Sequence, residues 1–112
     1  MAQSNGQAPT QMTFFARFED DILAGKKTIT IRDYSESHYQ VGSIVDVYTL
    51  EANQWFCQLK ILNVQPIEFE SLTSIHAQQE NMTLSELKQV ISEIYPNQTA
   101  FYVIDFELIQ QG

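Results

Sequence analysis

The segment from Ala100 to Leu108 restricts the fold more than any other, because it is apolar on both faces of an extended chain. Successive side chains of a strand point to opposite faces. The apolar and aromatic residues lie on one face at Tyr102, Ile104, Phe106 and Leu108 and on the other face at Phe101 and Val103. Such a strand needs cover on both sides, so we expect it to be central in a sheet.

Two earlier stretches, 43–50 and 54–64, also read as strands. We expect them to pair across the short polar turn at 51–54, whose type stays open because it contains no glycine. In the second stretch the residues on one face are Trp55, Cys57, Leu59 and Ile61. Pro66 is predicted either to end this strand or to lie on a sheet edge, because proline has no N–H to donate.

Near the N-terminus, residues 12–25 begin extended and then become helical. The apolar residues at helical spacing are Phe15, Phe18 and Ile22. Gly25 is expected to end the helix in the left-handed conformation that residues with a Cβ avoid. The segment 27–32 then alternates as a strand. Its apolar face is formed by Ile29 and Ile31, and its polar face by Thr28, Thr30 and Arg32.

Two helices are predicted between the strand at 54–64 and the C-terminal strand that begins at Ala100. The first covers 71–80, with Leu72, Ile75 and His76 on one side and Asn81 as its stop. The second begins with the spacing of a capping box, formed by Thr83 and Glu86. Its apolar stripe ends before Pro96 and consists of Leu84, Leu87, Val90, Ile91 and Ile94.

A chain of 112 residues is one ordinary domain with no room for a separate cofactor-binding unit. Residues 1–11 lack the basic start and apolar stretch of a signal peptide and are predicted to be a disordered tail, 12–109 to be the domain, and 110–112 a second tail. The order of elements favours an α+β fold, a small mixed β-barrel with helices packed outside.

The single cysteine, Cys57, lies in an apolar strand pattern and is expected to be a small buried hydrophobe in a cytoplasmic protein. No apolar run reaches the ~20 residues of a membrane span, so we expect a soluble chain. We also expect a monomer, because no sustained apolar stripe remains once the helices are assigned to the core.

A net charge of −8 argues against a protein that holds nucleic acid mainly by neutralising phosphates. The few basic residues are nevertheless concentrated, since four of the six fall within one short stretch: Arg17, Lys26, Lys27 and Arg32. This asymmetry indicates a site in that part of an otherwise acidic molecule.

The residues that suggest chemistry are Lys27, Thr30, Arg32, His38, His76 and Glu80. Each also has a purely structural explanation: exposed charges paired with nearby acids, a good strand former, or an exposed loop histidine. Taken alone, the pattern favours the structural explanation. His76 and Glu80 have the spacing of two metal ligands on a helix, but a chain with two histidines and one cysteine is a poor source of a zinc site, and we expect no metal.

The segment GKKTITIR (25–32) matches the signature of the ASCH domain superfamily, which is Gly, any residue, Lys, two residues, Thr, any residue, Arg. Three longer stretches, TFFARFEDDILAGKKTITIRD, QENMTLSELKQVI and IYPNQTAFYVIDFELI, resemble one branch of it, the small bacterial N4-acetylcytidine amidohydrolases. The resemblance extends from about Thr13 to Ile109, and the extra residues at both ends are its main departure.

This resemblance implies a fold similar to the PUA domains and a catalytic set of Lys27 as proton acceptor, Thr30 as nucleophile and Glu80 as proton donor. In a regular strand Lys27 and Thr30 would point to opposite faces, so Lys27 has to lie in the turn after Gly25. A lysine can act as a base only if its amine is neutral, and Lys26 and Arg32 are the neighbours expected to lower its pKa.

The predicted reaction is hydrolysis of N4-acetylcytidine to cytidine and acetate without a cofactor, with Arg32 or backbone amides stabilising the oxyanion. Stacking residues could come from Tyr39, Tyr95, Phe101 or Tyr102. The expected partner is a small nucleoside, with no stable nucleic-acid complex and no membrane. The alternatives are a non-catalytic PUA-like RNA-binding or regulatory module and a hydrolase of another small amide. The sequence does not distinguish acetylated base, ribonucleoside and deoxyribonucleoside.

Overall fold

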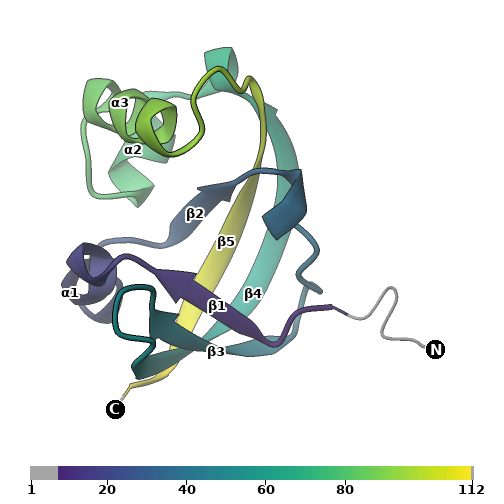
Figure 1. The fold of residues 1–112 in the computed structure, drawn as a ribbon, viewed down its shortest axis with the longest axis vertical. Helices are drawn as coiled ribbons and strands as arrows, with labels where there is room; N and C mark the ends of the chain where they lie inside the picture. The colour runs from purple at the N-terminus through teal and green to yellow at the C-terminus, as the bar shows by residue number, and fades with distance from the viewer. Residues whose placement is uncertain (1–7, 112) are drawn as a thin grey trace.

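The computed structural model describes residues 8–111 and forms one curved, five-stranded mixed sheet with short helices at its ends and edges (Figure 1). The strands are β1 (Gln11–Phe14), β2 (Ile29–Arg32), β3 (Ile44–Thr49), β4 (Trp55–Glu68) and β5 (Ala100–Gln111). The α-helices are α1 (Glu19–Leu23), α2 (Ser74–Gln79) and α3 (Leu84–Ile94), and three 3₁₀ turns are η1 (Ala16–Phe18), η2 (Tyr34–Glu36) and η3 (Phe69–Ser71). The strand order is β1-β3-β4-β5-β2, with β1 and β3 parallel and the other pairs antiparallel.

The central position predicted for the C-terminal strand is confirmed, because β5 pairs with β4 on one side and β2 on the other. The two faces of β5 join different cores. Phe101 and Val103 pack in a cluster with α2, α3 and the isoleucines of β2. Ile104 and Phe106 pack in a second cluster with β1, β3, β4 and α1. The double-sided apolar pattern therefore reflects two separate hydrophobic clusters.

The α+β class is confirmed, but the predicted barrel does not close. The strands β1 and β2 form the two edges of the sheet and are not paired with each other. A side chain spans this opening, since Arg32 Nη2 donates to the Thr13 carbonyl oxygen at 2.7 Å. The opening matters because backbone pairing there would occupy the space that forms the pocket described below.

The predicted end of the first helix at Gly25 is confirmed. Gly25 has a φ of +75°, which is the left-handed region. Its N–H donates to the Ile22 carbonyl at 3.1 Å, and the Lys26 N–H donates to the Asp21 carbonyl at 2.9 Å, the pair of bonds of a Schellman motif. The Lys27 N–H also donates to the Asp21 carbonyl, at 3.1 Å. This turn places Lys27 before β2 begins, as the sequence required.

The two predicted helices exist, with one error in the first. Helix α2 begins only at Ser74, and its inward residue is Ala77, whereas Ile75 is 64% exposed. The periodic reading started the helix too early and so rotated its apolar face. Asn81 does stop this helix, with a φ of +58°.

Helix α3 starts with the predicted capping box, because Thr83 Oγ1 accepts from the Glu86 N–H at 3.2 Å and Glu86 Oε1 accepts from the Thr83 N–H at 2.9 Å. It ends before Pro96, as expected.

The strand predictions need smaller corrections. The pairing of β3 with β4 is confirmed. Strand β4 continues through Pro66, which pairs with Tyr102 of β5 in a stretch that β3 does not reach, so Pro66 lies on a local edge. Strand β1 includes Gln11 and β5 extends to Gln111, so ordered strand reaches into both predicted tails. Most of the N-terminal tail prediction, residues 1–7, lies outside the described residues.

The prediction that Cys57 is a buried hydrophobic residue agrees with the structure. Cys57 is fully buried, and burial raises the pKa of its thiol to about 12, so it is a core residue. Within residues 8–111, no helix is long and apolar enough to cross a membrane.

The Schellman turn gives a test of this local structure. We expect Gly25→Ala to lower the free energy of unfolding by about 1–2 kcal/mol, because a Cβ is disfavoured at this φ even though no atom lies within 4 Å of its position. Gly25→Asn should cost less, since asparagine adopts the left-handed region more readily. Urea unfolding measures both, and equal stability of Gly25→Ala and the parent would contradict the assignment.

Candidate active site

A pocket of about 180 Å³ opens between the two hydrophobic clusters. One wall is the inner face of α3, with Leu87 and Ile91, and the opposite wall is the segment from Phe14 to Phe18. The polar groups that line it are few and include all four predicted site residues: Lys27, Thr30, Arg32 and Glu80. Segments distant in the sequence are therefore brought to one cavity.

Lys27 and Glu80 form a buried ion pair at the base of this pocket. The two residues are only 3% and 5% exposed, and Lys27 Nζ donates to Glu80 Oε1. Nζ also donates to the Ile29 carbonyl oxygen at 2.9 Å. Phe18 covers the amine, with its ring centroid 4.9 Å from Nζ. The pair is thus held in an apolar setting with hydrogen bonds on the amine.

Two further contacts hold the C-terminal end of α2 against the turn that carries Lys27. The Thr28 N–H donates to the Gln79 carbonyl oxygen at 2.8 Å. Asn81 Nδ2 donates to Asp21 Oδ1 at 3.2 Å. Because Glu80 lies between Gln79 and Asn81, these bonds fix its carboxylate relative to the amine.

The environment lowers the pKa of Lys27 from its ordinary value. The largest cause is burial, which disfavours the ammonium, and the Arg32 guanidinium acts in the same direction. The carboxylates of Glu80 and Asp21 oppose this shift. Arg32 is therefore the cationic neighbour that the sequence suggested, whereas Lys26 is exposed and does not line the pocket.

Thr30 presents its hydroxyl to the pocket from β2 and is 5% exposed. Arg32 Nε donates to Thr30 Oγ1 at 2.8 Å, so the hydroxyl oxygen accepts this bond and its own hydrogen is left for another acceptor. Thr30 pairs with Ile104 across the sheet, which fixes the direction in which its side chain points.

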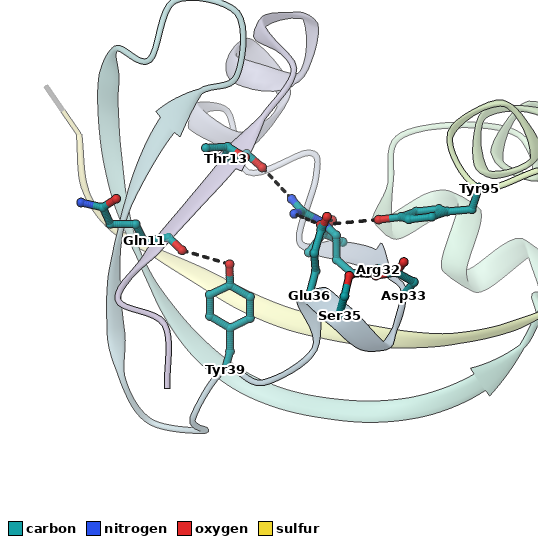
Figure 2. Close-up of polar contacts among 9 residues, drawn as sticks. Gln11, Thr13, Arg32, Asp33, Ser35, Glu36, Tyr39 and Tyr95 are labelled. Carbon is teal, nitrogen blue, oxygen red and sulfur yellow. Dashed lines mark hydrogen bonds and ion pairs between the residues drawn. The ribbon is translucent and has the colours of Figure 1, made fainter. Parts of the chain in front are cut away.

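The Arg32 guanidinium is held on all three nitrogens, as Figure 2 shows in part. Besides its bonds to Thr30 and to the Thr13 carbonyl, Nη1 donates to Glu36 Oε1 at 2.8 Å. Tyr95, at the end of α3, donates its hydroxyl to the same Glu36 oxygen at 3.5 Å. Glu36 and Tyr95 also line the pocket. Glu36 was not among the residues predicted from the sequence, where its four-residue separation from Arg32 was the only signal.

The other residues considered from the sequence lie elsewhere. His38 is exposed, and His76 accepts from the Thr73 N–H through Nδ1 at 3.1 Å as part of the cap of α2. Among residues 8–111, no group of three His, Cys, Asp or Glu side chains could hold a metal ion. Of the four aromatic residues considered for stacking, Tyr95 lines the pocket, whereas Phe101 is buried in the core.

This arrangement belongs to a known class. The ASCH domain family model matches residues 10–110, and the chain belongs to the ASCH domain family. Solved structures agree on the fold: an ASCH domain from Lactobacillus crispatus JV V101 superposes with a TM-score of 0.76 at 15% identity, covering 93% of this chain and 81% of that one. An ASCH protein from Zymomonas mobilis superposes with a TM-score of 0.67 at 11% identity, and the match covers 87% of this chain and 65% of that one.

Relatives of higher identity carry a more specific name. The chain is 63% identical over 102 residues to a Vibrio vulnificus protein named N(4)-acetylcytidine amidohydrolase. The aligned region covers 91% of this chain and 98% of that protein. Proteins of the same name from Pasteurella multocida and Citrobacter koseri are 61% and 56% identical, covering 88% and 90% of this chain and 95% and 98% of theirs. The family resemblance found in the sequence is thereby confirmed.

The buried pair gives a prediction that does not depend on activity. Lys27→Met and Glu80→Leu should each lower the free energy of unfolding by about 3–5 kcal/mol, because each leaves one polar partner buried alone. The double variant should lose much less than the sum, since both polar groups are then absent. Urea unfolding of the four proteins measures this, and additive losses would refute the pairing.

Proposed function

We propose that this protein is an N(4)-acetylcytidine amidohydrolase with Lys27 as proton acceptor, Thr30 as nucleophile and Glu80 as proton donor. The observation that carries the proposal is the gathering of these three buried residues in one pocket, in a chain 56–63% identical to relatives of that name. The reactive form of the pair has a neutral amine on Lys27 and the proton on Glu80. The lowered pKa of Lys27 supports such a form.

In the first step the Thr30 hydroxyl oxygen attacks the acetyl carbonyl carbon, and the hydroxyl proton passes to Lys27 Nζ. The carbonyl electrons form an oxyanion. Arg32 Nε lies 2.8 Å from Thr30 Oγ1, the atom that bonds to the acetyl carbon, so its positive charge stabilises the negative charge that develops on the neighbouring former carbonyl oxygen. We assign Arg32 this electrostatic role, alongside contact with the substrate.

The tetrahedral intermediate then collapses. The bond between the acetyl carbon and N4 breaks, Glu80 gives its proton to N4, and cytidine leaves. Thr30 now carries the acetyl ester, Lys27 is an ammonium and Glu80 a carboxylate. Because the two are hydrogen-bonded, the pair stays neutral as a whole through this exchange.

Water completes the cycle. Glu80 accepts a proton as the water oxygen attacks the ester carbon, and Lys27 returns its proton to Thr30 as acetic acid departs. Every group then has its starting protonation. This scheme uses only side chains, and we propose no cofactor.

The pocket also suits a neutral nucleoside. Its walls are largely aromatic and aliphatic, which favours a flat pyrimidine over a charged phosphate chain. The net charge of −8 opposes binding of a polyanion, so we propose a small-molecule substrate and no stable nucleic-acid complex. A cytoplasmic monomer remains part of the proposal.

Three conservative variants test the catalytic set: Lys27→Met, Thr30→Val and Glu80→Gln. Each should lower kcat/KM for release of cytidine from N4-acetylcytidine by at least about 10²-fold, because each removes a group that takes part in proton transfer or bond formation. Chromatography of the products measures this, after circular dichroism confirms that each variant is folded.

The matched controls are Lys26→Met and Thr28→Val, whose side chains are exposed neighbours of the same type. Both should keep parental activity. No cytidine release by the parent would refute the proposed substrate, and RNA binding with a steep salt dependence would then favour a PUA-like binding module. Release from other small amides, with N4-acetylcytidine inert, would instead indicate a different amidohydrolase.

The pH profile tests the shared proton of the pair. Because the reactive pair holds one proton, activity should fall when a second proton is added at low pH and when both are lost at high pH, giving a bell shape. The Asp21 carboxylate raises the pKa of Lys27, so Asp21→Asn should move the low-pH limb, at which Lys27 takes up the second proton, to lower pH. Asp20→Asn is the control for net charge, and an equal shift from it would contradict this assignment.

A further inference from the structure

We propose that Glu36 is the sugar-binding group of the pocket: its carboxylate accepts hydrogen bonds from the ribose hydroxyls and makes the enzyme prefer an acetylated ribonucleoside to the acetylated base. This inference rests on the proposed function and extends it to the part of the substrate that does not react. The Glu36 carboxylate would discriminate among the acetylated ribonucleoside, deoxyribonucleoside and base, which share the same reactive amide.

Glu36 lies at a partly exposed position in the lining of the pocket. It lines the pocket from η2, and its side chain is 46% exposed, in contrast to the buried carboxylate of Glu80. Its Oε1 atom accepts from both Arg32 and Tyr95. Its Oε2 atom has no hydrogen-bond partner within residues 8–111. One oxygen is therefore anchored while the other is left for a donor at the solvent side.

The distance from the nucleophile suits a sugar. Thr30 Oγ1 and Glu36 Oε1 are joined through one guanidinium by two hydrogen bonds of 2.8 Å each. This places the two oxygens less than about 8 Å apart, given the fixed size of the guanidinium. In an N4-acylated cytidine the pyrimidine ring separates the amide from the ribose by a comparable length. A substrate with its acetyl carbon at Thr30 can thus present its sugar to Glu36.

The chemistry of the two groups is complementary. An ionised carboxylate only accepts hydrogen bonds, and vicinal ribose hydroxyls offer two donors. Charge-assisted bonds of this kind are stronger than neutral ones. The base alone has only its N1–H at that end and none of the sugar hydroxyls, and a deoxyribose has lost one of the two. The exposed apolar residues Leu50 and Ile94 line the same pocket as Glu36.

Tyr95 supports this orientation from the opposite wall, as Figure 2 shows. Its hydroxyl points to Glu36 and lies 3.5 Å from Oε1. Burial and the negative charge of Glu36 raise the pKa of Tyr95 to about 12, so the phenol keeps its proton and acts as a donor. Glu36 Oε1 is then held by one donor from β2 and one from the residue that follows α3, which leaves Oε2 for a donor of the substrate.

The experiment compares N4-acetylcytidine, N4-acetyl-2′-deoxycytidine and N4-acetylcytosine with the parent and with Glu36→Ala and Glu36→Gln. The measured quantity is the ratio of kcat/KM for the ribonucleoside to that for the base, because any disturbance of Arg32 cancels in this ratio. The parent should prefer the ribonucleoside, with the deoxyribonucleoside intermediate. Glu36→Ala should lower the ratio by about tenfold, mainly through KM, and Glu36→Gln by less.

The control is Glu93→Gln, an exposed carboxylate on α3 that does not line the pocket, and its ratio should equal that of the parent. A parent that uses all three substrates equally would overturn the inference while leaving the proposed function intact. A Glu36→Ala variant that loses activity on all three in parallel would also overturn it, because Glu36 would then serve only to hold Arg32. A parent that releases acetate from none of them would refute the proposed function itself.

Discussion

An ammonium and a carboxylate that are both almost fully buried have to satisfy each other, and the Lys27–Glu80 pair organises this molecule for that reason. The amine comes from the turn before β2 and the carboxylate from the end of α2. Their pairing requires the Schellman turn at Gly25, the left-handed stop at Asn81 and the bond from Thr28 to Gln79 to be formed together. Local backbone geometry at three places therefore serves one contact.

The opening between the edge strands β1 and β2 belongs to the same site, because residues of both strands line the pocket. A closed barrel would pair β1 with β2 and fill the space beside Thr30. The structure leaves these edges apart and spans them with the Arg32 side chain, which reaches the Thr13 carbonyl. An edge strand normally needs protection from pairing with other chains. Here both edges are short, and the gap between them is the pocket.

The sequence predicted the features that depend on local patterns. The double-sided apolar pattern of β5, the capping box at Thr83 and the glycine stop at Gly25 each follow from a few adjacent residues and proved correct. The face of α2 was wrong at Ile75, because a helix of one or two turns gives too few periods to fix its start. Whether the edge strands β1 and β2 pair with each other has no signal in adjacent residues, so the sequence pattern could not predict that the barrel stays open.

For the site, too, residues close together in the sequence were predicted and distant contacts were not. Lys27, Thr30 and Arg32 fall in one octet, which the family resemblance marked as functional. Glu80 was joined to them only through that resemblance, since 53 residues separate it from Lys27. The partnership of Glu36 with Arg32 was overlooked, because η2 is a single 3₁₀ turn and a loop gives no periodicity to indicate its direction.

Burial of the pair has opposite consequences for stability and for chemistry. An apolar setting penalises the ammonium, and burial is the largest cause of the lowered pKa of Lys27, so the neutral amine becomes easier to reach. A substrate that fills the pocket removes the remaining water and shifts the balance further towards the neutral form. In the proposed mechanism, the neutral amine that activates Thr30 would then arise mainly when a substrate is bound. In that mechanism the acidic surface takes no part in the proton exchange, because solvent hardly reaches the two residues that would share the proton.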